Sequence, residues 1–425
     1  MNTRPGHPAG SHTHLERTPY VSTRIVGDAP PAEGAASCLW SLNVELTERC
    51  NNACVHCYIN RPADDVQAAE RELPTAAWKQ VLTEAASLGC LSVHFTGGEP
   101  LLRKDFANLY IFARRLGLKV LLSTNATLIT AELADMFARV PPLEGIQVSL
   151  YGMTAGSCDA VTGRPGSFDA AWEGVRLLRE RHIPFAVGWA VLPQNRPETD
   201  RLREWADATP EMAEPPSFAV ALSLRARRDS PGKNDLIRAL RLPPEEFVRV
   251  QNQVAENRRN HLLRFCSQFA GPQGDRLFRC HAGRHQLTVD AYGVLQLCLL
   301  LRHPETVYDL KQGSLQEACA EFGPDVRRRR ARNPEYLRRC ARCFLATLCE
   351  QCPAQSWMEH GTLDAPVQYF CDVTHAEATE LGLLREGEKS WEVEDWKQRI
   401  NRCLAKTQGP GRPLPANTKG ECHAT

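Results

Sequence analysis

The chain has 425 residues, of which 43% are hydrophobic and 24% charged, and its 51 basic and 50 acidic residues leave a net charge of about +1. This balance gives no basic field for nucleic acid, no stretch is long and apolar enough for a membrane span, and Met1–Tyr20 lacks the apolar core of a signal peptide. We therefore expect a cytoplasmic protein without membrane or nucleic-acid partners. In that compartment its 17 cysteines are expected to hold metal rather than form disulfides.

The first 37 residues, rich in Pro, Gly, Ala and Thr, are expected to be disordered. From residue 40 to 222, short β-branched runs alternate with amphipathic helical patterns. Strict alternation of this kind predicts parallel strands joined by crossover helices. The predicted strands are 42–46, 91–96, 118–124, 145–150, 185–191 and 217–223, and the predicted helices lie near 75–88, 105–116, 130–139, 168–182 and 196–207.

The second half of the chain has a different character. Residues 225–242 are interpreted as a linker, and a helix is predicted from Pro243–Pro244 to about Leu263. A cysteine-rich region follows, in which residues 287–298 alternate and turn as a hairpin does. The fold class is thus α/β, a partial (β/α)6 barrel followed by a small cysteine-rich α+β domain with a β-hairpin. The expected divisions are head 1–37, barrel core 38–225, linker and helix 226–265, cysteine-rich domain 266–375, C-terminal helices 376–404 and a disordered tail 405–425.

Cys50, Cys54 and Cys57 form a C-x3-C-x2-C run directly after the first predicted strand. Three thiolates can hold three corners of a four-iron cluster and leave the fourth iron open to a small molecule. Short cysteine runs also bind zinc, but a zinc site needs a fourth ligand nearby, and His56, between two of the cysteines, is poorly placed to supply it. An iron–sulfur site is therefore favoured.

The second predicted strand ends in the sequence TGGEP, residues 96–100. Gly97 and Gly98 let the backbone approach a ligand closely, and Glu99 can accept hydrogen bonds from an ammonium group. By itself this segment could equally be a glycine-rich turn with a solvated glutamate.

Together, ERCNNACVHCY and TGGEP resemble the radical S-adenosylmethionine superfamily over about residues 40–225. The resemblance implies a cluster on Cys50, Cys54 and Cys57 and S-adenosylmethionine on its open iron. It also implies that Gly97, Gly98 and Glu99 hold the ammonium group and that His56 packs near adenine. Ser123, Asn125 and Ser149, at later strand ends, are candidates for ribose and carboxylate contacts, although they could equally cap strands or turns.

Seven further cysteines, with Cys266 as a possible eighth, follow a second pattern. Only five residues separate the C-x2-C pairs 340/343 and 349/352, too few for an ordinary zinc ribbon. The pattern resembles the SPASM extension of radical S-adenosylmethionine enzymes, which holds two auxiliary four-iron clusters. The resemblance implies one cluster on Cys340, Cys343, Cys349 and Cys371, and another on Cys280, Cys298 and Cys352, with Cys266 as a possible fourth ligand. Without that ligand, this second cluster has an open iron; zinc in one of the sites is the other alternative.

The resemblance implies reductive cleavage of S-adenosylmethionine to a 5′-deoxyadenosyl radical that abstracts hydrogen from a substrate. We favour a ribosomally made peptide or protein, with a flavodoxin- or ferredoxin-type electron donor and a separate leader-peptide-binding protein as partners. Cys158 is a candidate hydrogen donor. The alternatives are a small-molecule substrate, such as a carbohydrate, a haem precursor or a peptide-derived cofactor, and a multicluster electron-transfer protein.

Overall fold

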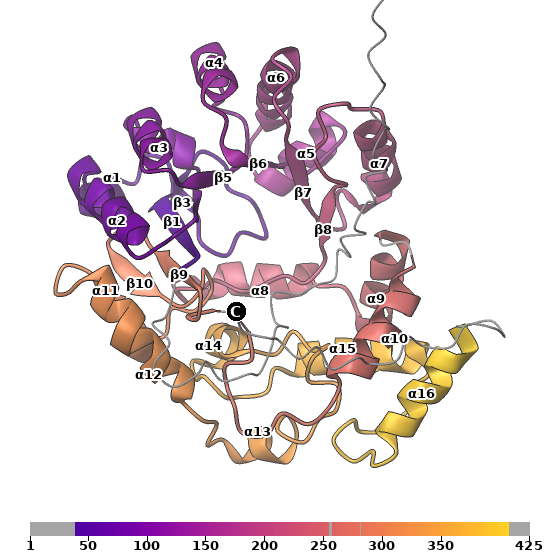
Figure 1. Cartoon of the computed structure of the whole chain (residues 1–425). Coiled ribbons are helices and arrows are strands. Elements are labelled where there is room, and N and C mark those ends of the chain that lie inside the picture. The colour runs from indigo at the N-terminus through magenta and orange to yellow at the C-terminus, as the bar shows by residue number, and fades with distance from the viewer. Residues whose placement is uncertain (1–38, 255–256, 281, 408–425) are drawn as a thin grey trace, which may run out of the picture.

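The computed structural model describes residues 39–254, 257–280 and 282–407. The predicted head 1–37 and the tail beyond residue 407 lie outside this range. A single nine-stranded sheet runs through both halves of the described chain, in the order β11-β10-β9-β1-β4-β5-β6-β7-β8, beside a two-stranded pair, β2-β3. Its strands curve into an arc that is open on one side, with helices along its outer surface (Figure 1).

The six strands predicted for the barrel are all present, each within a few residues of its expected bounds, and all pair in parallel. They are β1 (Ser41–Thr47), β4 (Ser92–Gly97), β5 (Lys119–Thr124), β6 (Leu143–Ser149), β7 (Ala186–Ala190) and β8 (Ser217–Ala219). The partial barrel is therefore confirmed. The remaining strands are β2 (Arg49–Cys50), β3 (Arg61–Pro62), β9 (Gln286–Val289), β10 (Val294–Gln296) and β11 (Val307–Asp309).

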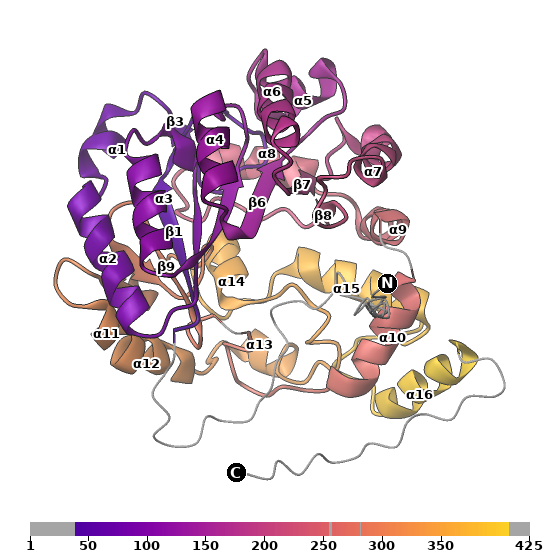
Figure 2. The same ribbon diagram turned by 45° about the horizontal axis from the view of Figure 1, so that its top comes forward.

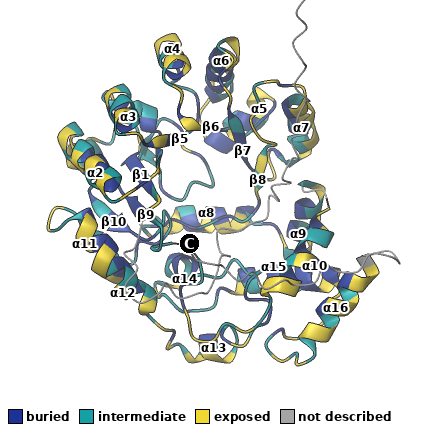
Figure 3. Cartoon of the chain, viewed as in Figure 1, coloured by how far each residue is buried: buried dark blue, intermediate teal, exposed yellow. Residues whose placement is uncertain are grey.

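The helices of the barrel half follow the strands in alternation, as the amphipathic patterns predict. Their inward faces are buried against the sheet and their outward faces are exposed (Figure 3). These helices are α1 (Val66–Arg71), α2 (Thr75–Ser87), α3 (Phe106–Arg115), α4 (Ala131–Arg139), α5 (Ala155–Thr162), α6 (Ser167–Glu180) and α7 (Thr199–Asp207), with the short 3-10 turns η1 (Pro100–Leu102) and η2 (Arg196–Glu198).

The two faces of the barrel strands differ in chemistry. Leu42, Val44 and Leu46 of β1 belong to the apolar core under the helices. The alternate residues Asn43 and Glu45 are also buried but polar, because side chains of a strand point to opposite faces in turn. The inner face of the arc, the barrel lumen, is thus unusually polar for a buried sheet.

The predicted linker 225–242 is wrong in part, because residues 231–240 form helix α8. Ser230 accepts a hydrogen bond from the amide of Lys233, and Pro231 occupies the first turn. These are favourable N-terminal residues for a helix, and they outweigh the Gly and charged residues that made the segment resemble a linker. The single helix predicted to end near Leu263 is also wrong, because two helices, α9 and α10, stand in its place.

The predicted hairpin exists as β9 and β10, but it does not stand apart from the barrel. β9 pairs in parallel with β1, from Ser41 against Gln286 to Val44 against Val289, so the hairpin extends the barrel sheet. Residues more than 240 positions apart in the chain therefore share one core. No local pattern could have predicted this pairing.

The remaining elements pack below the open side of the arc, where α14 and α15 lie beneath the strands (Figure 2). Helix α15 begins eight residues before the predicted 376, and α16 ends within the predicted tail. The second-half helices are α8 (Pro231–Leu240), α9 (Pro244–Val254), α10 (Arg258–Phe269), α11 (Leu315–Glu317), α12 (Gly323–Arg328), α13 (Pro334–Arg338), α14 (Pro353–His360), α15 (Gln368–Leu381) and α16 (Trp396–Thr407), with η3 (Pro304–Thr306) and the π-turn η4 (Ala318–Phe322). Among the described residues, none of these helices is long and apolar enough to cross a membrane.

Candidate metal centres and the barrel lumen

The cysteine triplet lies in a loop that starts at the carboxyl end of β1. The short pair β2-β3 closes the base of this loop, and its middle is tied to the end of α5. The amide of Ala53 donates to the carbonyl of Thr162 at 2.8 Å, and that of Val55 to Val161 at 2.9 Å. The loop is therefore held across the top of the barrel, the end at which parallel α/β folds bind ligands.

The three sulfurs of the triplet lie within electrostatic reach of one another. Burial raises the pKa of Cys50 to about 12, and burial together with Cys57 and Cys50 raises the pKa of Cys54. Backbone amides point at the sulfurs: Asn52 donates to Cys50 Sγ at 3.4 Å and Asn60 to Cys57 Sγ at 3.3 Å. Crowded, buried thiols with amide donors fit a cationic iron–sulfur group, which deprotonates its ligands and is tuned by N–H···S bonds.

Gly97 and Gly98 bring the end of β4 against the start of the cysteine loop. The amide of Gly98 donates to Thr47 at 2.7 Å and that of Glu99 to Arg49 at 2.9 Å. A Cβ on Gly98 would lie 2.2 Å from the Arg49 carbonyl oxygen, and one on Gly97 would lie 2.1 Å from that of Thr47. The glycines thus allow a close approach, but the group approached is the loop's own backbone rather than a ligand.

Glu99 is fully buried and already accepts three hydrogen bonds. They come from Thr124 Oγ1 at 2.8 Å, the Asn125 amide at 2.7 Å and the Leu101 amide at 3.1 Å. Burial raises the pKa of Glu99 to about 7 despite these donors. In the described structure Glu99 therefore joins the ends of β4 and β5, and its role in holding an ammonium group stays a prediction.

Asn125, predicted as a cofactor contact, reaches the cysteine loop directly. Its side-chain nitrogen, Nδ2, lies 2.9 Å from Asn51 Oδ1 and 3.8 Å from Cys50 Sγ. Ser123 instead sits inside a polar ladder, where its hydroxyl bonds His94 Nε2 at 2.7 Å and Gln147 at 3.3 Å. The ladder fixes Ser123 to neighbouring strands, and its contact to a cofactor stays a prediction.

A cavity of about 270 Å³ opens in the lumen below the loop. His56 and Tyr58, the neighbours of Cys57 on either side, both line it, as does Ser149. Burial lowers the pKa of His56 to about 4, so its ring is neutral at physiological pH, and its Nδ1 lacks a partner within the described chain. The structure thus brings together the predicted contacts His56 and Ser149, and it adds Tyr58, which only its position after Cys57 could have indicated.

On its other side the loop borders a cleft of about 640 Å³ that includes Cys50. Three cationic side chains of this cleft hold loop carbonyls. Arg164 donates to Asn51 at 2.7 Å, Lys233 to Cys54 at 2.6 Å, and Arg225 to Asn60 at 3.1 Å. Sequence reasoning missed these residues, because Arg225 and Lys233 lie in the segment interpreted as a linker and no local pattern marks Arg164.

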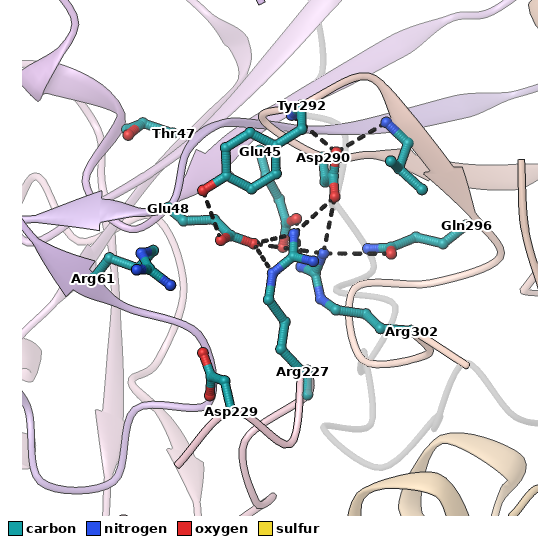
Figure 4. A network of polar contacts seen from close by, with 12 residues as sticks. Glu45, Thr47, Glu48, Arg61, Arg227, Asp229, Asp290, Tyr292, Gln296 and Arg302 are labelled. Atoms are coloured by element: carbon teal, nitrogen blue, oxygen red, sulfur yellow. Dashed lines mark hydrogen bonds and ion pairs between the residues drawn. The ribbon is translucent and has the colours of Figure 1, made fainter. Parts of the chain in front are cut away.

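A buried ionic network joins the start of the cysteine loop to the hairpin (Figure 4). Arg302 is 3% exposed and lies 2.5 Å from Glu45, which is 0% exposed, and 3.4 Å from Asp290. Arg227 bridges Asp290 and Glu48, and Tyr292 donates to Glu48 at 3.0 Å. Since Glu48 precedes Cys50 by two residues and Arg302 follows Cys298 by four, the network ties two cysteine regions together.

The second half brings one predicted cysteine set together. Cys340, Cys343, Cys349 and Cys371 all line one small cavity of about 30 Å³. Burial raises the pKa of Cys340 to about 12, with the neighbouring Cys349 and Cys343 adding to the shift. Arg339 points a guanidinium nitrogen at Cys371 Sγ, 3.2 Å away. Four crowded thiols at one cavity fit a four-cysteine cluster.

The other predicted set comes together only in part. Burial and the neighbouring Cys280 and Cys352 raise the pKa of Cys298 to about 12, so these three lie close to one another. Cys266 does not join them. It is buried on α10 among Leu262, Phe344 and other apolar residues of a separate core, and burial, followed by Glu377, raises its pKa. Cys266 as fourth ligand therefore has no support in the structure.

The structure also bears on two predictions from the sequence, Cys158 as hydrogen donor and a single metal ion such as zinc at the cysteines. Cys158 is buried between α5 and α6, with its Sγ 3.8 Å from Ser167 Oγ, and it does not line the lumen cavity. Its role as hydrogen donor gains no support.

Within the described ranges, no three His, Cys, Asp or Glu side chains are gathered as a single metal ion would need. Ligands of a four-iron cluster bind different irons and stand farther apart than ligands of one ion.

Comparisons with known proteins agree with this geometry. Residues 44–206 match the family model described as the Radical SAM superfamily. The AdoMet-dependent heme synthase of Methanosarcina barkeri is 28% identical over 324 residues, 75% of this chain and 92% of that protein. The PqqA peptide cyclase of Gluconobacter oxydans is 36% identical over 155 residues, 36% of this chain but only 42% of the cyclase.

Among solved structures, Streptococcus suis SuiB bound to its precursor peptide SuiA is similar with a TM-score of 0.59 at 17% identity, over 77% of this chain and 74% of SuiB. At that identity the likeness concerns the fold alone. The partial α/β barrel and the family match of residues 44–206 together define a Radical SAM domain. Residues 44–206 of this enzyme belong to the Radical SAM superfamily, and a SPASM-type C-terminal extension stays a prediction.

Proposed function

We propose that this enzyme cleaves S-adenosylmethionine reductively and modifies a ribosomally made peptide. When bound, the cluster and S-adenosylmethionine supply an electron and a 5′-deoxyadenosyl radical that takes a hydrogen atom from the substrate. The observation that carries the proposal is the position of Cys57. Both of its neighbours, His56 and Tyr58, line the lumen cavity, so the predicted cluster and the space for a substrate share one wall.

The chain's own residues have distinct parts in this proposal. Cys50, Cys54 and Cys57 hold the first cluster, and Arg164 and Lys233 fix the carbonyls of their loop. His56 stays neutral and packs edge-on against Tyr151, with ring centroids 5.0 Å apart. The helix-covered barrel wall limits the access of water to a reactive intermediate in the lumen. Auxiliary clusters on the second-half cysteines, and a flavodoxin- or ferredoxin-type donor, complete the proposed equipment.

The experiment is anaerobic reconstitution with iron and sulfide, followed by reduction in the presence of S-adenosylmethionine and detection of 5′-deoxyadenosine. We expect cleavage by the native chain and none by Cys54→Ala. The matched control is Cys403→Ala, which alters a cysteine on α16 far along the chain from the loop. An iron-loaded native protein that forms no 5′-deoxyadenosine would refute the proposed function.

A second candidate substrate is a haem precursor, which the match over 92% of a heme synthase favours. The peptide is supported by the similarity to PqqA peptide cyclase and by the fold shared with SuiB. The two are separated by asking which compound raises 5′-deoxyadenosine formation: an unmodified precursor peptide or an iron coproporphyrin. Free thiols throughout the described cysteines fit a reducing compartment, so we retain the proposal of a cytoplasmic enzyme.

A further inference from the structure

The cavity at which four cysteines of the second half meet has a wall that the cysteines alone do not explain. Three residues that carry N–H groups line it beside the thiols, and they come from three separate segments of the chain. Arg279 lies before β9, Arg339 directly follows α13, and Trp391 lies between α15 and α16. The fold therefore brings three donors from distant positions to one small space.

Each of these residues has a buried N–H group without a hydrogen-bond partner within the described chain. The atoms are Nε of Arg279, Nε of Arg339 and Nε1 of Trp391. Buried donors in folded proteins are normally paired, so three unpaired donors at one cavity point to an acceptor that occupies it. The sulfurs of a four-iron cluster are acceptors of this kind.

Arg339 already reaches one of the four cysteines. Its Nη2 lies 3.2 Å from Cys371 Sγ, and its Nη1 donates to Glu335 at 3.1 Å. Its guanidinium lies over the ring of Trp391, 4.8 Å from the ring centroid. This contact fixes the N–H groups of Arg339 and Trp391 relative to each other.

Arg279 is held in place from the side of α13. Its Nη2 donates to the hydroxyl of Tyr336 at 2.8 Å, and that hydroxyl donates to the carbonyl of Arg276 at 3.0 Å. Tyr336 is itself buried. The guanidinium of Arg279 is thus oriented by a fixed partner, while its Nε is left for another acceptor.

The positive charge at this cavity matters when an electron arrives. Taking up one electron makes a four-iron cluster and its thiolates more negative by one charge. Cations and N–H donors near the sulfurs stabilise that state more than the oxidised one, so they raise the reduction potential. Glu335, the acidic partner of Arg339, is partly exposed and also pairs with Arg338, so it offsets the charge of Arg339 only in part.

We propose, on the basis of the auxiliary clusters included in the proposed function, that Arg279, Arg339 and Trp391 donate N–H···S hydrogen bonds to the cluster of this cavity and raise its reduction potential. The cluster thereby accepts one electron from a reduced flavodoxin- or ferredoxin-type donor. The donor is oxidised by one electron, and no covalent bond of the protein forms or breaks.

The test is a potentiometric titration of the reconstituted full chain, followed by electron paramagnetic resonance of the reduced clusters. The signal that is absent from Cys343→Ala belongs to the cluster of this cavity. Trp391→Phe keeps an aromatic ring beside Arg339 but loses the N–H group. We expect it to lower the midpoint potential of that signal by about 59 mV, which is a tenfold change in the equilibrium constant for one electron.

Arg339→Met should lower the potential further, because it removes a cation as well as N–H donors. Arg338→Met is its matched control. Arg338 pairs with the same Glu335, but its side chain is 60% exposed against 13% for Arg339, and it does not line the cavity. Trp40→Phe, at an exposed position before β1, is the control for Trp391→Phe. Both controls should keep the native potential.

Melting temperature and iron content are compared with those of the native protein before each titration. Should Arg339→Met fail to fold, Trp391→Phe still decides the question, because Trp391 Nε1 bonds no part of the described chain. The inference is overturned if Trp391→Phe with native iron content keeps the native potential, or if Arg338→Met lowers it as much as Arg339→Met does.

The inference also fails if Cys343→Ala retains the native iron content, because no cluster then occupies the cavity. A native protein that shows the expected shifts but forms no 5′-deoxyadenosine would instead refute the proposed cleavage of S-adenosylmethionine. The two failures are therefore distinguishable.

Discussion

At the scale of single residues, the candidate site includes a position, Gly98, at which no side chain fits. Gly98 lies so close to the backbone of Arg49 that even a methyl group would overlap it. The same approach lets the amides of Gly98 and Glu99 bond the loop. The two glycines therefore fix the base of the cysteine loop to β4, whatever else they contact.

Gly98→Ala should lower the free energy of unfolding by at least about 1–3 kcal/mol, the range typical of overpacking. The cost arises because the backbone of Arg49 cannot move aside as a side chain can. It should also lower the iron bound by the first loop. Gly156→Ala is the matched control, since a Cβ there meets nothing within 4 Å and Ala suits a helix. Thermal melting and iron analysis provide the readouts; equal melting temperatures for both variants would contradict the steric argument.

Glu45 lends itself to a pH prediction. Burial raises its pKa from 4.5 to about 7, with Arg302 opposing the shift. A carboxyl group whose folded pKa is raised stabilises the fold fully below its unfolded pKa. That contribution is lost as pH rises from about 4.5 to about 7, and it amounts to about 3 kcal/mol at most.

Glu45→Gln removes this ionisation while keeping the shape of the side chain. The stability of the variant relative to native protein should therefore rise between pH 5 and pH 7.5. Urea denaturation at several pH values measures the difference, and the comparison cancels the titrating groups that do not interact with Glu45, leaving Glu45 and its coupled neighbours Glu48 and Asp290. A difference that stays constant or falls across this window would show that Glu45 ionises without cost.

At the scale of elements, the hairpin β9-β10 is held to β1 both by strand pairing and by the ionic network of Figure 4. Arg302 supplies the cation for Glu45 and contacts Asp290 from the loop after Cys298. Its removal would leave buried carboxylates without their partner. Buried charges that lose a partner are far more costly than exposed ones.

Arg302→Met should cost about 3–5 kcal/mol of folding free energy. Arg328→Met provides the control, because the Arg328–Asp325 pair is exposed on both sides and such pairs contribute at most about 1 kcal/mol. Denaturant titration of the two variants in parallel tests the contrast. Similar losses would mean that the network contributes little.

At the scale of the whole molecule, two cysteine groups in the second half stand beside a barrel that carries the triplet. The distribution of cysteines predicts about 12 irons if three four-iron clusters form. The structure places Cys266 in a separate apolar core and brings only Cys280, Cys298 and Cys352 together. The auxiliary cluster nearer the barrel sheet would then have three protein ligands.

Iron analysis of Cys298→Ala and Cys266→Ala tests this assignment. Cys298→Ala should lose about four irons after reconstitution, whereas Cys266→Ala should retain the native content. Since Cys266 is buried, its variant is first checked for a native melting temperature. Loss of four irons from a folded Cys266→Ala variant would restore Cys266 as a ligand.

The sequence by itself determined the class of the barrel and most of the groups in which the cysteines gather. Strand and helix periodicity gave six strands within a few residues, because each amphipathic pattern reports locally which side is buried. The spacing of Cys340, Cys343 and Cys349, with Cys371, anticipated four thiols that now line one cavity.

Only the tertiary structure decided the pairing of β9 with β1, the isolation of Cys266 and the cationic cleft beside the cysteine loop. Each of these depends on which distant segments meet. Lys233 reaches Cys54 across 179 positions, and Arg302 reaches Glu45 across 257. Local propensity carries no information about such long-range contacts. They form when the curved sheet of the barrel packs against the second half of the chain.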